Sequence, residues 1–244
     1  MSQFADKDKY VKNLFNSIAG KYDLMNLLMT WGMLPGWQRF VLKKTALKKG
    51  SHGLDVCCGT GELALQMRRI VGEEGQVYGL DFSENMLVVA EEKAKGLAYG
   101  NLAFVQGDAL DMPFADNTFD GATNGFALRN VIDIPRTIKE MTRVVKPGGR
   151  VVCLEVSRPL NPVLRMGFNL YFFKVVPLIG QIAGKGNTID NKYPAYTWLP
   201  ESLKTFPDQE KLKEIFIGAG LEQVEYFGLS GGIVTVHVGT KPLA

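Results

Sequence analysis

The sequence predicts an α/β fold with a seven-stranded, mostly parallel, doubly wound sheet. Three observations predict it. From residue 53 onward, short apolar runs alternate with amphipathic segments of helical period. The first apolar run ends in a glycine turn, Gly59-Thr60-Gly61, as in a βαβ unit. Only five residues, 228–232, separate the last two runs, and because a parallel crossover needs about a dozen or more, the final strand returns antiparallel as a hairpin.

The elements follow in chain order from the apolar pattern. An amphipathic helix is predicted around residues 11–18, and the apolar stretch 22–41 is expected to turn at least once, because it contains Trp31, Pro35, Gly36 and Trp37. Strands are predicted over 53–58, 76–81, 102–106, 119–124, 150–156, 221–227 and 233–239. Helices are predicted over 61–71, from an N-cap at Ser83 to about 95, over 134–145 and over 208–219. Residues 146–149, Lys-Pro-Gly-Gly, are expected to form a turn that ends the preceding helix.

The composition excludes several classes of protein. Of 244 residues, 46% are hydrophobic and 22% are charged, which excludes a globally disordered chain. The polar N-terminus lacks the apolar region of a secretory signal, and the odd set Cys57, Cys58 and Cys153 gives no disulfide framework, so a cytoplasmic protein is expected. With only two histidines, His52 and His237, no metal site is expected.

The carboxyl ends of the predicted strands carry the candidate ligand-binding residues, because ligands of open α/β sheets bind there. Gly59 and Gly61 let the backbone approach a ligand at the N-terminus of the next helix. Asp81 ends the second strand and can accept both hydroxyls of a ribose. Asp108 follows the third strand and can accept a hydrogen bond from the adenine amine, with Phe82 against the ring. Asp55, in the first strand, is the third acid in register.

Two adenosine cofactors suit this pattern, and an empty tight turn is the alternative to both. Gly59-x-Gly61-x-x-Ala64 also fits the fingerprint of a dinucleotide-binding turn. However, fifty residues precede the first strand, and the terminal hairpin departs from the six-stranded parallel sheet expected for NAD. S-adenosylmethionine has adenine and ribose but no pyrophosphate, and it suits the arrangement better.

The segment 158–206 is rich in aromatic residues and carries a net charge of +4, as residues 1–50 carry +6. It holds eight of the 25 aromatic residues of the chain. Its apolar stretch 163–182 is interrupted by Arg165, Lys174 and Pro177, so it is not expected to span a bilayer. It is expected to lie at a membrane surface, to cover a pocket as a lid, or both. Because the basic residues form no short cluster, no nucleic-acid partner is expected.

Several stretches resemble known methyltransferases. Residues 55–62, Asp-Val-Cys-Cys-Gly-Thr-Gly-Glu, resemble the first motif of class I methyltransferases, and residues 146–150 resemble their motif before the fifth strand. Four further stretches resemble the ubiquinone/menaquinone biosynthesis C-methyltransferase family: 15–26, 126–131, 196–202 with 206–207, and 231–233. The resemblance covers nearly the whole chain.

The resemblance implies a Rossmann-like class I fold in one domain, 1–244. Residues 1–50 would be an N-terminal helical cap, 51–157 the cofactor-binding core, 158–206 an insertion that forms the substrate lid, and 207–244 a C-terminal helix and hairpin. The implied cofactor is S-adenosylmethionine, with S-adenosylhomocysteine as product and no metal. The implied substrate is a prenylated quinol, foremost demethylmenaquinol, which would become menaquinol. A benzoquinol, another apolar small molecule, and an accessory protein without catalysis are the alternatives, and a homodimer is left open.

By the same resemblance, Thr60, Asp81, Asp108 and Ala109 contact the cofactor, and Tyr22, Arg129 and Asn130 form the reaction site. Methylation of a ring carbon needs an electron-rich ring, so the site must stabilise a phenolate and release a proton. Arg129 suits the first task only, since the guanidinium pKa exceeds about 12. A surface salt bridge from Arg129 to Asp133 is the alternative. Tyr22 and Asn130 would hold the ring hydroxyl, and the proton acceptor is left open.

Overall fold

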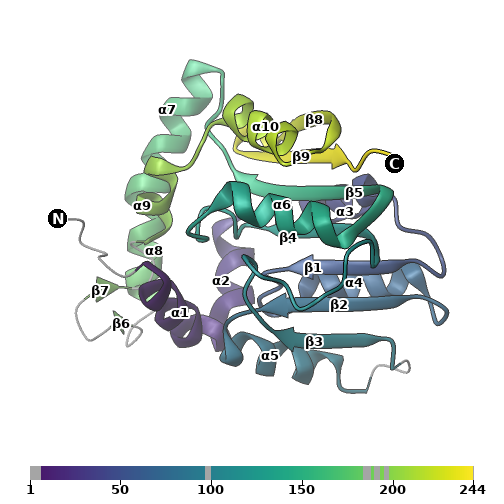
Figure 1. The fold of residues 1–244 in the computed structure, drawn as a ribbon. Coiled ribbons are helices and arrows are strands. Elements are labelled where there is room, and N and C mark those ends of the chain that lie inside the picture. The colour runs from purple at the N-terminus through teal and green to yellow at the C-terminus, as the bar shows by residue number, and fades with distance from the viewer. Residues whose placement is uncertain (1–6, 97–99, 184–187, 190–192, 195–197, 244) are drawn as a thin grey trace.

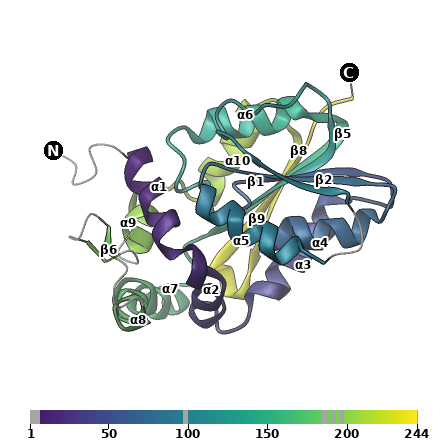
Figure 2. The same cartoon turned by 90° about the horizontal axis from the view of Figure 1, so that it is seen from below.

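The computed structural model describes residues 7–96, 100–183, 188–189, 193–194 and 198–243. A seven-stranded sheet of order β3-β2-β1-β4-β5-β9-β8 forms its centre, with helices on both faces (Figure 1). Figure 2 shows α6 and α10 on one face and α3, α4 and α5 on the other. The expected doubly wound sheet of seven strands is confirmed.

The strand pairing follows the predicted pattern. β1 to β5 pair in parallel, whereas β9 pairs antiparallel with both β5 and β8. The terminal hairpin is thereby confirmed. The strands span His52–Val56 (β1), Gln76–Asp81 (β2), Leu102–Gln106 (β3), Phe119–Gly125 (β4), Val145–Val156 (β5), Glu222–Leu229 (β8) and Val234–Thr240 (β9).

The core helices span Leu34–Thr45 (α3), Glu62–Val71 (α4), Glu84–Ala94 (α5), Ile134–Val144 (α6) and Gln209–Gly218 (α10). The last three begin at side-chain caps that the sequence supplies. The Ser83 hydroxyl accepts from the backbone N–H of Met86, which confirms the predicted N-cap, and the Asp133 and Asp208 carboxylates cap α6 and α10.

The Lys-Pro-Gly-Gly segment is the main difference from the predicted elements. It was expected to be a helix-ending turn, but β5 already begins at Val145 and contains residues 146–149. The register passes from Phe119 opposite Val145 to Gly121 opposite Arg150, so the segment forms an irregularity inside the strand. Two backbone hydrogen bonds explain this. The Gly148 N–H donates to the Lys241 carbonyl and the Lys241 N–H donates to the Gly149 carbonyl, each at 2.9 Å, which holds the segment to the residue after β9.

Two apolar clusters fill the two sides of the sheet. Ile138 and Met141 of α6 pack with Phe216 of α10 on one side, and Val41 of α3 packs with Met67 of α4 on the other. Each of these side chains is essentially buried. Burial of this kind provides most of the stabilisation of such a layered fold. The sheet is therefore a rigid base, and its carboxyl edge can hold side chains in fixed positions.

The cap and the lid lie together at that carboxyl edge (Figure 1). Val11 and Leu14 of the cap form one apolar cluster with Met86 of α5 and Trp198 of the lid. The part of the predicted cap that lies at this edge, for which the name is kept, comprises Lys7–Ile18 (α1), the 3-10 turn Ala19–Lys21 and Tyr22–Met29 (α2). The helix α3, which was also expected in the cap, packs against the sheet instead. The lid comprises Pro162–Leu170 (α7), the π-helical segment Tyr171–Val175, Val176–Ala183 (α8), Thr188–Ile189 (β6), Tyr193–Pro194 (β7) and Trp198–Thr205 (α9).

The helical run Pro162–Ile179 has a property that the sequence analysis did not expect. Among the described residues it is the one run long and apolar enough, by length and composition, to cross a bilayer, with a mean hydropathy of 1.2. Arg165 and Lys174 lie within it. Only 17% of it is buried inside the protein, so most of this apolar helix faces outward.

Candidate active site

Two cavities meet at the carboxyl edge of the sheet. The larger, of about 340 Å³, lies over the glycine turn, and we call it the cofactor-side cavity. The smaller, of about 130 Å³, lies between the cap and the lid, and we call it the lid-side cavity. Four residues line both cavities: Phe15, Tyr22, Phe126 and Asn130. A group bound in one cavity can therefore reach a group bound in the other at this junction.

The glycine turn adopts a backbone conformation that requires glycine at residue 61. Gly59 and Gly61 have φ values of 54° and 79°. A Cβ on Gly61 would lie 2.8 Å from the Phe104 ring, too close for any other residue, so Gly61 lets α4 begin directly against β3. Gly59 faces the cofactor-side cavity, where the nearest side-chain atom to a Cβ would be on Tyr22, at 3.8 Å. The backbone at Gly59 is thus open to a bound ligand.

Asp81 anchors the floor of the cofactor-side cavity. Its carboxylate accepts the backbone N–H of Gly59 and that of Ser83, each at 2.8 Å. Burial raises the pKa of this carboxyl to about 6, although these N–H donors oppose the shift. Each carboxylate oxygen has a second lone pair, so the group can also accept two ribose hydroxyls. Asp81 thus lines the cavity in which the predicted contact with a ribose would form.

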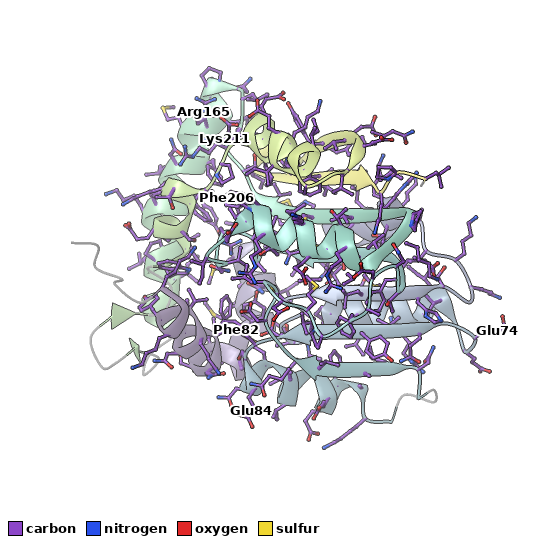
Figure 3. All side chains as sticks on the ribbon, in the orientation of Figure 1. Glu74, Phe82, Glu84, Arg165, Phe206 and Lys211 are labelled. Carbon is purple, nitrogen blue, oxygen red and sulfur yellow. The ribbon has the colours of Figure 1, made fainter. Side chains whose placement is uncertain are left out.

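The three other residues assigned to adenosine also line the cofactor-side cavity: Phe82, Asp108 and Ala109. Figure 3 shows Phe82 at the carboxyl edge of the sheet. The Asp108 carboxylate accepts the backbone N–H of Leu110 at 2.9 Å, which orders the loop after β3. Five residues of the predicted cofactor set thus line one cavity: Gly59, Asp81, Phe82, Asp108 and Ala109.

Asp55 and Thr60 lie elsewhere, around a smaller hollow of about 60 Å³ behind the glycine turn. This hollow shares Tyr22, Gly59 and Phe126 with the cofactor-side cavity. Asp55 accepts a 2.8 Å hydrogen bond from the Thr123 hydroxyl, and burial raises the pKa of its carboxyl to about 7. The structure therefore places Asp55 beneath the turn as a support, and not in the larger cavity.

The Thr60 side chain points toward the cap. Its hydroxyl donates to the Asp23 carboxylate at 2.6 Å. Lys93 of α5 forms salt bridges to Asp23 and, at 2.7 Å, to Glu62 of α4. This network fixes the start of α2 and so positions the neighbouring Tyr22. Thr60 was expected to contact the cofactor, and its contact with the cap was not predicted from the sequence.

Arg129 lies in a buried ion pair at the lid-side cavity. Its Nη1 atom is 2.7 Å from Oε2 of Glu155, and its backbone N–H donates to Oε1 at 3.3 Å. The side chain of Arg129 is only 6% exposed. The alternative of a surface pair with Asp133 is therefore wrong, because Asp133 caps α6 instead. The sequence analysis missed Glu155, although a lone carboxylate in the apolar run 151–156 was an available signal.

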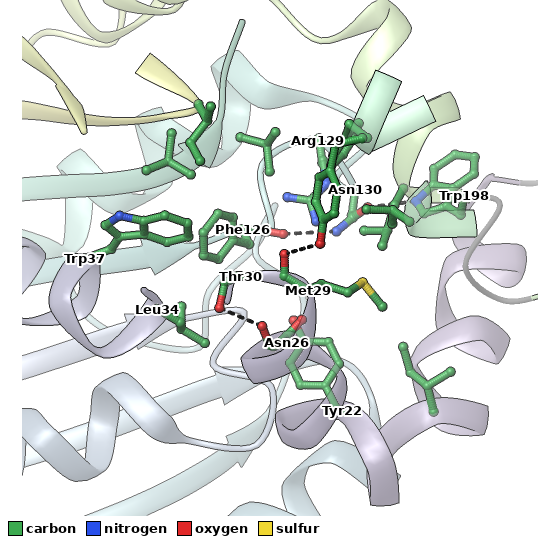
Figure 4. Close-up of a pocket in the computed structure, with 18 of the residues that line it drawn as sticks. Tyr22, Asn26, Met29, Thr30, Leu34, Trp37, Phe126, Arg129, Asn130 and Trp198 are labelled. Carbon is green, nitrogen blue, oxygen red and sulfur yellow. Dashed lines mark hydrogen bonds between the residues drawn. The ribbon is translucent and has the colours of Figure 1, made fainter. Parts of the chain in front are cut away.

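Tyr22 and Asn130 stand at the junction of the two cavities (Figure 4). Burial raises the pKa of the Tyr22 phenol, so it remains a neutral donor at physiological pH, while a hydrogen bond with Asn26 acts in the opposite sense. Oδ1 of Asn130 accepts from the Trp198 indole at 2.8 Å, and its Nδ2 donates to the Phe126 carbonyl at 3.3 Å. The three residues predicted for the reaction site are thus brought to one place.

The residues that line the cofactor-side cavity suit an adenosine cofactor. Among the residues that the structure describes, no group of three or more His, Cys, Asp or Glu is gathered to hold a metal. A buried acid, an open glycine backbone and an aromatic ring around 340 Å³ match a ribose with its base.

Solved structures that are similar in fold include methyltransferases. An S-adenosylmethionine-dependent methyltransferase from Aquifex aeolicus aligns with a TM-score of 0.60 and 22% identity, over 83% of this chain and 88% of that chain. Another from Thermotoga maritima aligns with a TM-score of 0.63 and 19% identity, over 95% and 99%. The fold is that of the class I methyltransferases, as the sequence analysis expected.

Sequence comparison gives the family. Residues 3–241 match the ubiE/COQ5 methyltransferase family, and the chain belongs to it. It is 46% identical to the demethylmenaquinone methyltransferase of Desulfitobacterium hafniense (strain Y51), over 99% of this chain and 94% of that protein. It is 42% identical to that of Shouchella clausii (strain KSM-K16), over 97% and 98%. The chain is an S-adenosylmethionine-dependent methyltransferase, which confirms the enzyme class and cofactor expected from the sequence.

Proposed function

We propose that this enzyme transfers a methyl group from S-adenosylmethionine to a ring carbon of a prenylated quinol, with demethylmenaquinol as the substrate and menaquinol as the product. The observation that carries the proposal is the junction of the cofactor-side cavity, which holds the acids Asp81 and Asp108, with the lid-side cavity at Tyr22, Phe126 and Asn130. The names of the relatives at 42–46% identity support the same substrate.

The cofactor-side cavity supplies the contacts that adenosine needs. Asp81 binds the ribose hydroxyls, the Gly59 backbone approaches the sugar closely, and Phe82 covers the base. Bound there, S-adenosylmethionine supplies the methyl group on a sulfonium, which is already a good leaving group. The protein therefore needs to align the acceptor and enrich its carbon, and it needs no further activation of the donor.

The lid-side cavity suits a quinol ring with an apolar tail. Aromatic and aliphatic side chains line most of it, among them Trp37, Phe168, Phe172 and Leu199. Its polar side chains gather near the junction, where Arg129 and Asn130 can reach a ring hydroxyl. The guanidinium would stabilise the phenolate that makes the neighbouring ring carbon nucleophilic. An oxidised quinone has no such hydroxyl, so the proposal requires the reduced substrate.

We further propose that the enzyme works at the inner face of the cytoplasmic membrane, as a peripheral protein. The outer face of the cap and lid carries large exposed apolar side chains, which we call the apolar patch: Leu27, Leu28, Trp31, Leu160, Val163, Leu164, Met166, Leu170 and Leu178. A solvent-exposed apolar set of this extent marks an interaction surface. The ring centroids of Trp31 and Tyr171 lie 6.1 Å apart, so the patch residues of the cap side and those of the lid adjoin here.

Cations accompany the apolar patch. Arg158, Arg165 and Lys174 line an open groove beside α7, and Figure 3 shows Arg165 on that helix. Cations beside an exposed apolar helix suit the anionic headgroups of the cytoplasmic leaflet. The apolar patch also borders the lid-side cavity, since Met29 and Tyr171 line the cavity next to exposed Trp31 and Leu170. A prenyl tail can therefore pass from the membrane to the ring site over a short apolar path.

The substrate is tested by mass spectrometry of quinones from cells that lack the protein and from cells that regain it. We expect a naphthoquinone to gain one methyl group on complementation, and complementation with Arg129→Lys to leave the precursor accumulated. A methylated benzoquinone would replace the proposed substrate with the benzoquinol. No methylated quinone in complemented cells would contradict the proposed function.

A further inference from the structure

A cluster of polar side chains lies in the apolar core directly behind the Arg129–Glu155 pair. Thr235 of β9 is the cross-strand partner of Glu155, and Ser157 and His237 each follow one of these residues on the same face of the sheet. All four are buried, with exposed fractions of 2% for Glu155, Thr235 and His237 and 8% for Ser157. The side chains around this polar cluster, among them Cys153 and Leu212, belong to the apolar core.

Three of these residues present polar atoms without a partner in the described part of the chain: Ser157 Oγ, Thr235 Oγ1 and His237 Nδ1. Nε2 of His237 lies 2.9 Å from the Gln209 carbonyl, which can only accept, so Nε2 carries the proton and Nδ1 is an acceptor. Burial lowers the pKa of His237 to about 4, which keeps the ring neutral. Buried polar groups are normally hydrogen-bonded, so three together call for a small polar ligand.

The same residues surround a cavity of about 30 Å³. A buried water needs about 10–15 Å³ of such space and two to four polar partners, so the cavity suits one or two water molecules. Arg158 and Asp208, both exposed, also line it, which brings the cavity to the protein surface. Glu155 forms its inner wall, and Val156 lines both this cavity and the lid-side cavity.

The proposed reaction must release one proton from this region. The ring carbon forms a bond to the methyl carbon, the electron pair of the carbon–sulfur bond goes to sulfur, and the hydrogen on that ring carbon leaves as a proton. Phenolate formation before the attack transiently releases a proton as well. Arg129 cannot accept it, because the guanidinium stays charged.

Charge balance favours Glu155 as the acceptor. The Arg129–Glu155 pair is neutral before the reaction, with one positive and one negative charge. If the substrate proton moves to Glu155, Arg129 becomes the partner of the phenolate, and the net charge of the site, the cofactor sulfonium included, does not change. Once the methyl group has been transferred, the cofactor is neutral, so a phenolate beside an ionised Glu155 would leave one anion without a partner in a low-dielectric region, which is costly.

We propose that Glu155 takes up the proton released from the quinol and that the water cavity bounded by Ser157, Thr235 and His237 carries it to the surface beside Asp208. This inference rests on the proposed quinol methylation. Glu155 acts here as the inner end of a proton outlet, and Ser157, Thr235 and His237 hold the water that links it to solvent.

The first test is a crystal structure at a resolution that shows ordered water. We expect water bonded to Ser157 Oγ, Thr235 Oγ1 and His237 Nδ1. A dry cavity would overturn the inference whatever the substrate proves to be, so this test is independent of the proposed function.

The second test measures single-turnover methyl transfer to a short-tailed 2-prenyl-1,4-naphthoquinol, in H₂O and in D₂O. Glu155→Gln should lower the rate by about 10²-fold, the lower range for loss of a general base. The double variant Ser157→Ala/Thr235→Val keeps the packing, and we expect a several-fold lower rate, a larger solvent isotope effect and an unchanged KM. Thr142→Val is the matched control, because its buried hydroxyl serves only its own helix, at 2.8 Å from the Ile138 carbonyl.

The outcomes separate the two proposals. A wild-type rate and isotope effect in the double variant would overturn the proton outlet, even if Glu155→Gln fails to fold. Equal losses in Thr142→Val and the double variant would likewise overturn it, since they would reflect packing. Absence of methyl transfer by the wild-type enzyme on every quinol would contradict the proposed function itself. The crystal structure would then show separately whether the cavity holds ordered water.

Discussion

The indole Nε1 of Trp198 donates a 2.8 Å hydrogen bond to Oδ1 of Asn130, which links the lid to the junction of the two cavities. Trp198 is buried and its ring lies 5.3 Å from that of Tyr10 in the cap. Because an indole can only donate, this bond orients the Asn130 amide, whose Nδ2 faces the Phe126 carbonyl. The lid thus sets the orientation of a side chain assigned to the reaction.

Trp198→Phe should lower kcat/KM for the quinol by roughly three- to tenfold, the loss expected for one buried hydrogen bond of about 0.5–1.5 kcal/mol. The affinity for the cofactor should stay unchanged, since Trp198 does not line the cofactor-side cavity. Steady-state kinetics with both substrates varied measures the two effects. Tyr226→Phe removes a 2.6 Å bond to Glu210 at the surface and is the control. Weaker cofactor binding with normal quinol kinetics would disagree with this role.

Asp81→Asn should weaken binding of S-adenosylmethionine by about tenfold or more, since a hydrogen bond to a charged group contributes about 1.5–3 kcal/mol. The carboxylate also holds the Gly59 N–H, so the amide will loosen the turn as well. Calorimetric titration measures the dissociation constant, and a thermal melt checks the fold. Asp116→Asn, at an exposed salt bridge to Arg143, serves as the control. An unchanged dissociation constant for Asp81→Asn would remove Asp81 from the cofactor site.

Periodicity and turn chemistry predicted most of the core, because the strand–helix alternation is local information. The seven-stranded, mostly parallel sheet, the antiparallel hairpin and the Ser83 cap all followed from it. The Lys-Pro-Gly-Gly segment did not, because its strand character depends on Lys241, some ninety residues later in the chain. Contacts of that range leave no periodic signal.

The candidate site was predictable where a residue follows a strand. Asp81 and Asp108 reached the cofactor-side cavity because strand ends meet at one edge of a parallel sheet. The partners of Thr60 and Arg129 were not predictable, since Asp23 lies in the cap and Glu155 on another strand. Only packing brings these pairs together, although the lone carboxylate in 151–156 was an available signal for Glu155.

Asp55→Asn should flatten the dependence of stability on pH. The pKa of Asp55 is raised to about 7 in the folded state by burial, above the ordinary value near 3.8. Between these values the native state binds more protons than the unfolded state, so the free energy of unfolding falls as pH rises. The advantage of the variant over wild type should therefore grow with pH, by at most about 1.4 kcal/mol per unit. Urea unfolding of both proteins at pH 4.5, 5.5 and 6.5 measures this difference. Parallel curves of unfolding free energy against pH would contradict a raised pKa at Asp55.

Met166→Glu/Leu170→Glu should reduce binding to vesicles containing anionic lipid by about tenfold, because two charges replace apolar side chains in the patch. Co-sedimentation measures the bound fraction. Val88→Glu is the control, since Val88 is an exposed apolar residue on α5, outside the apolar patch. Unchanged vesicle binding would exclude the apolar patch as the membrane-binding surface. If ultracentrifugation without lipid shows a dimer that the double variant dissociates, the apolar patch is covered by a second copy of the chain.

The central claim is that Arg129 stabilises a phenolate where the two cavities meet. Single-turnover methyl transfer to reduced and oxidised short-tailed 2-prenyl-1,4-naphthoquinone tests it most directly, with Arg129→Lys compared with wild type and with the surface control Arg69→Lys. Lysine keeps the charge beside Glu155 but loses the planar fork of donors. We expect transfer only to the reduced ring, a rate lower by about 10²–10³-fold in Arg129→Lys, and little change in cofactor affinity. A wild-type rate in a well-folded Arg129→Lys enzyme, or equal transfer to the oxidised ring, would contradict the account.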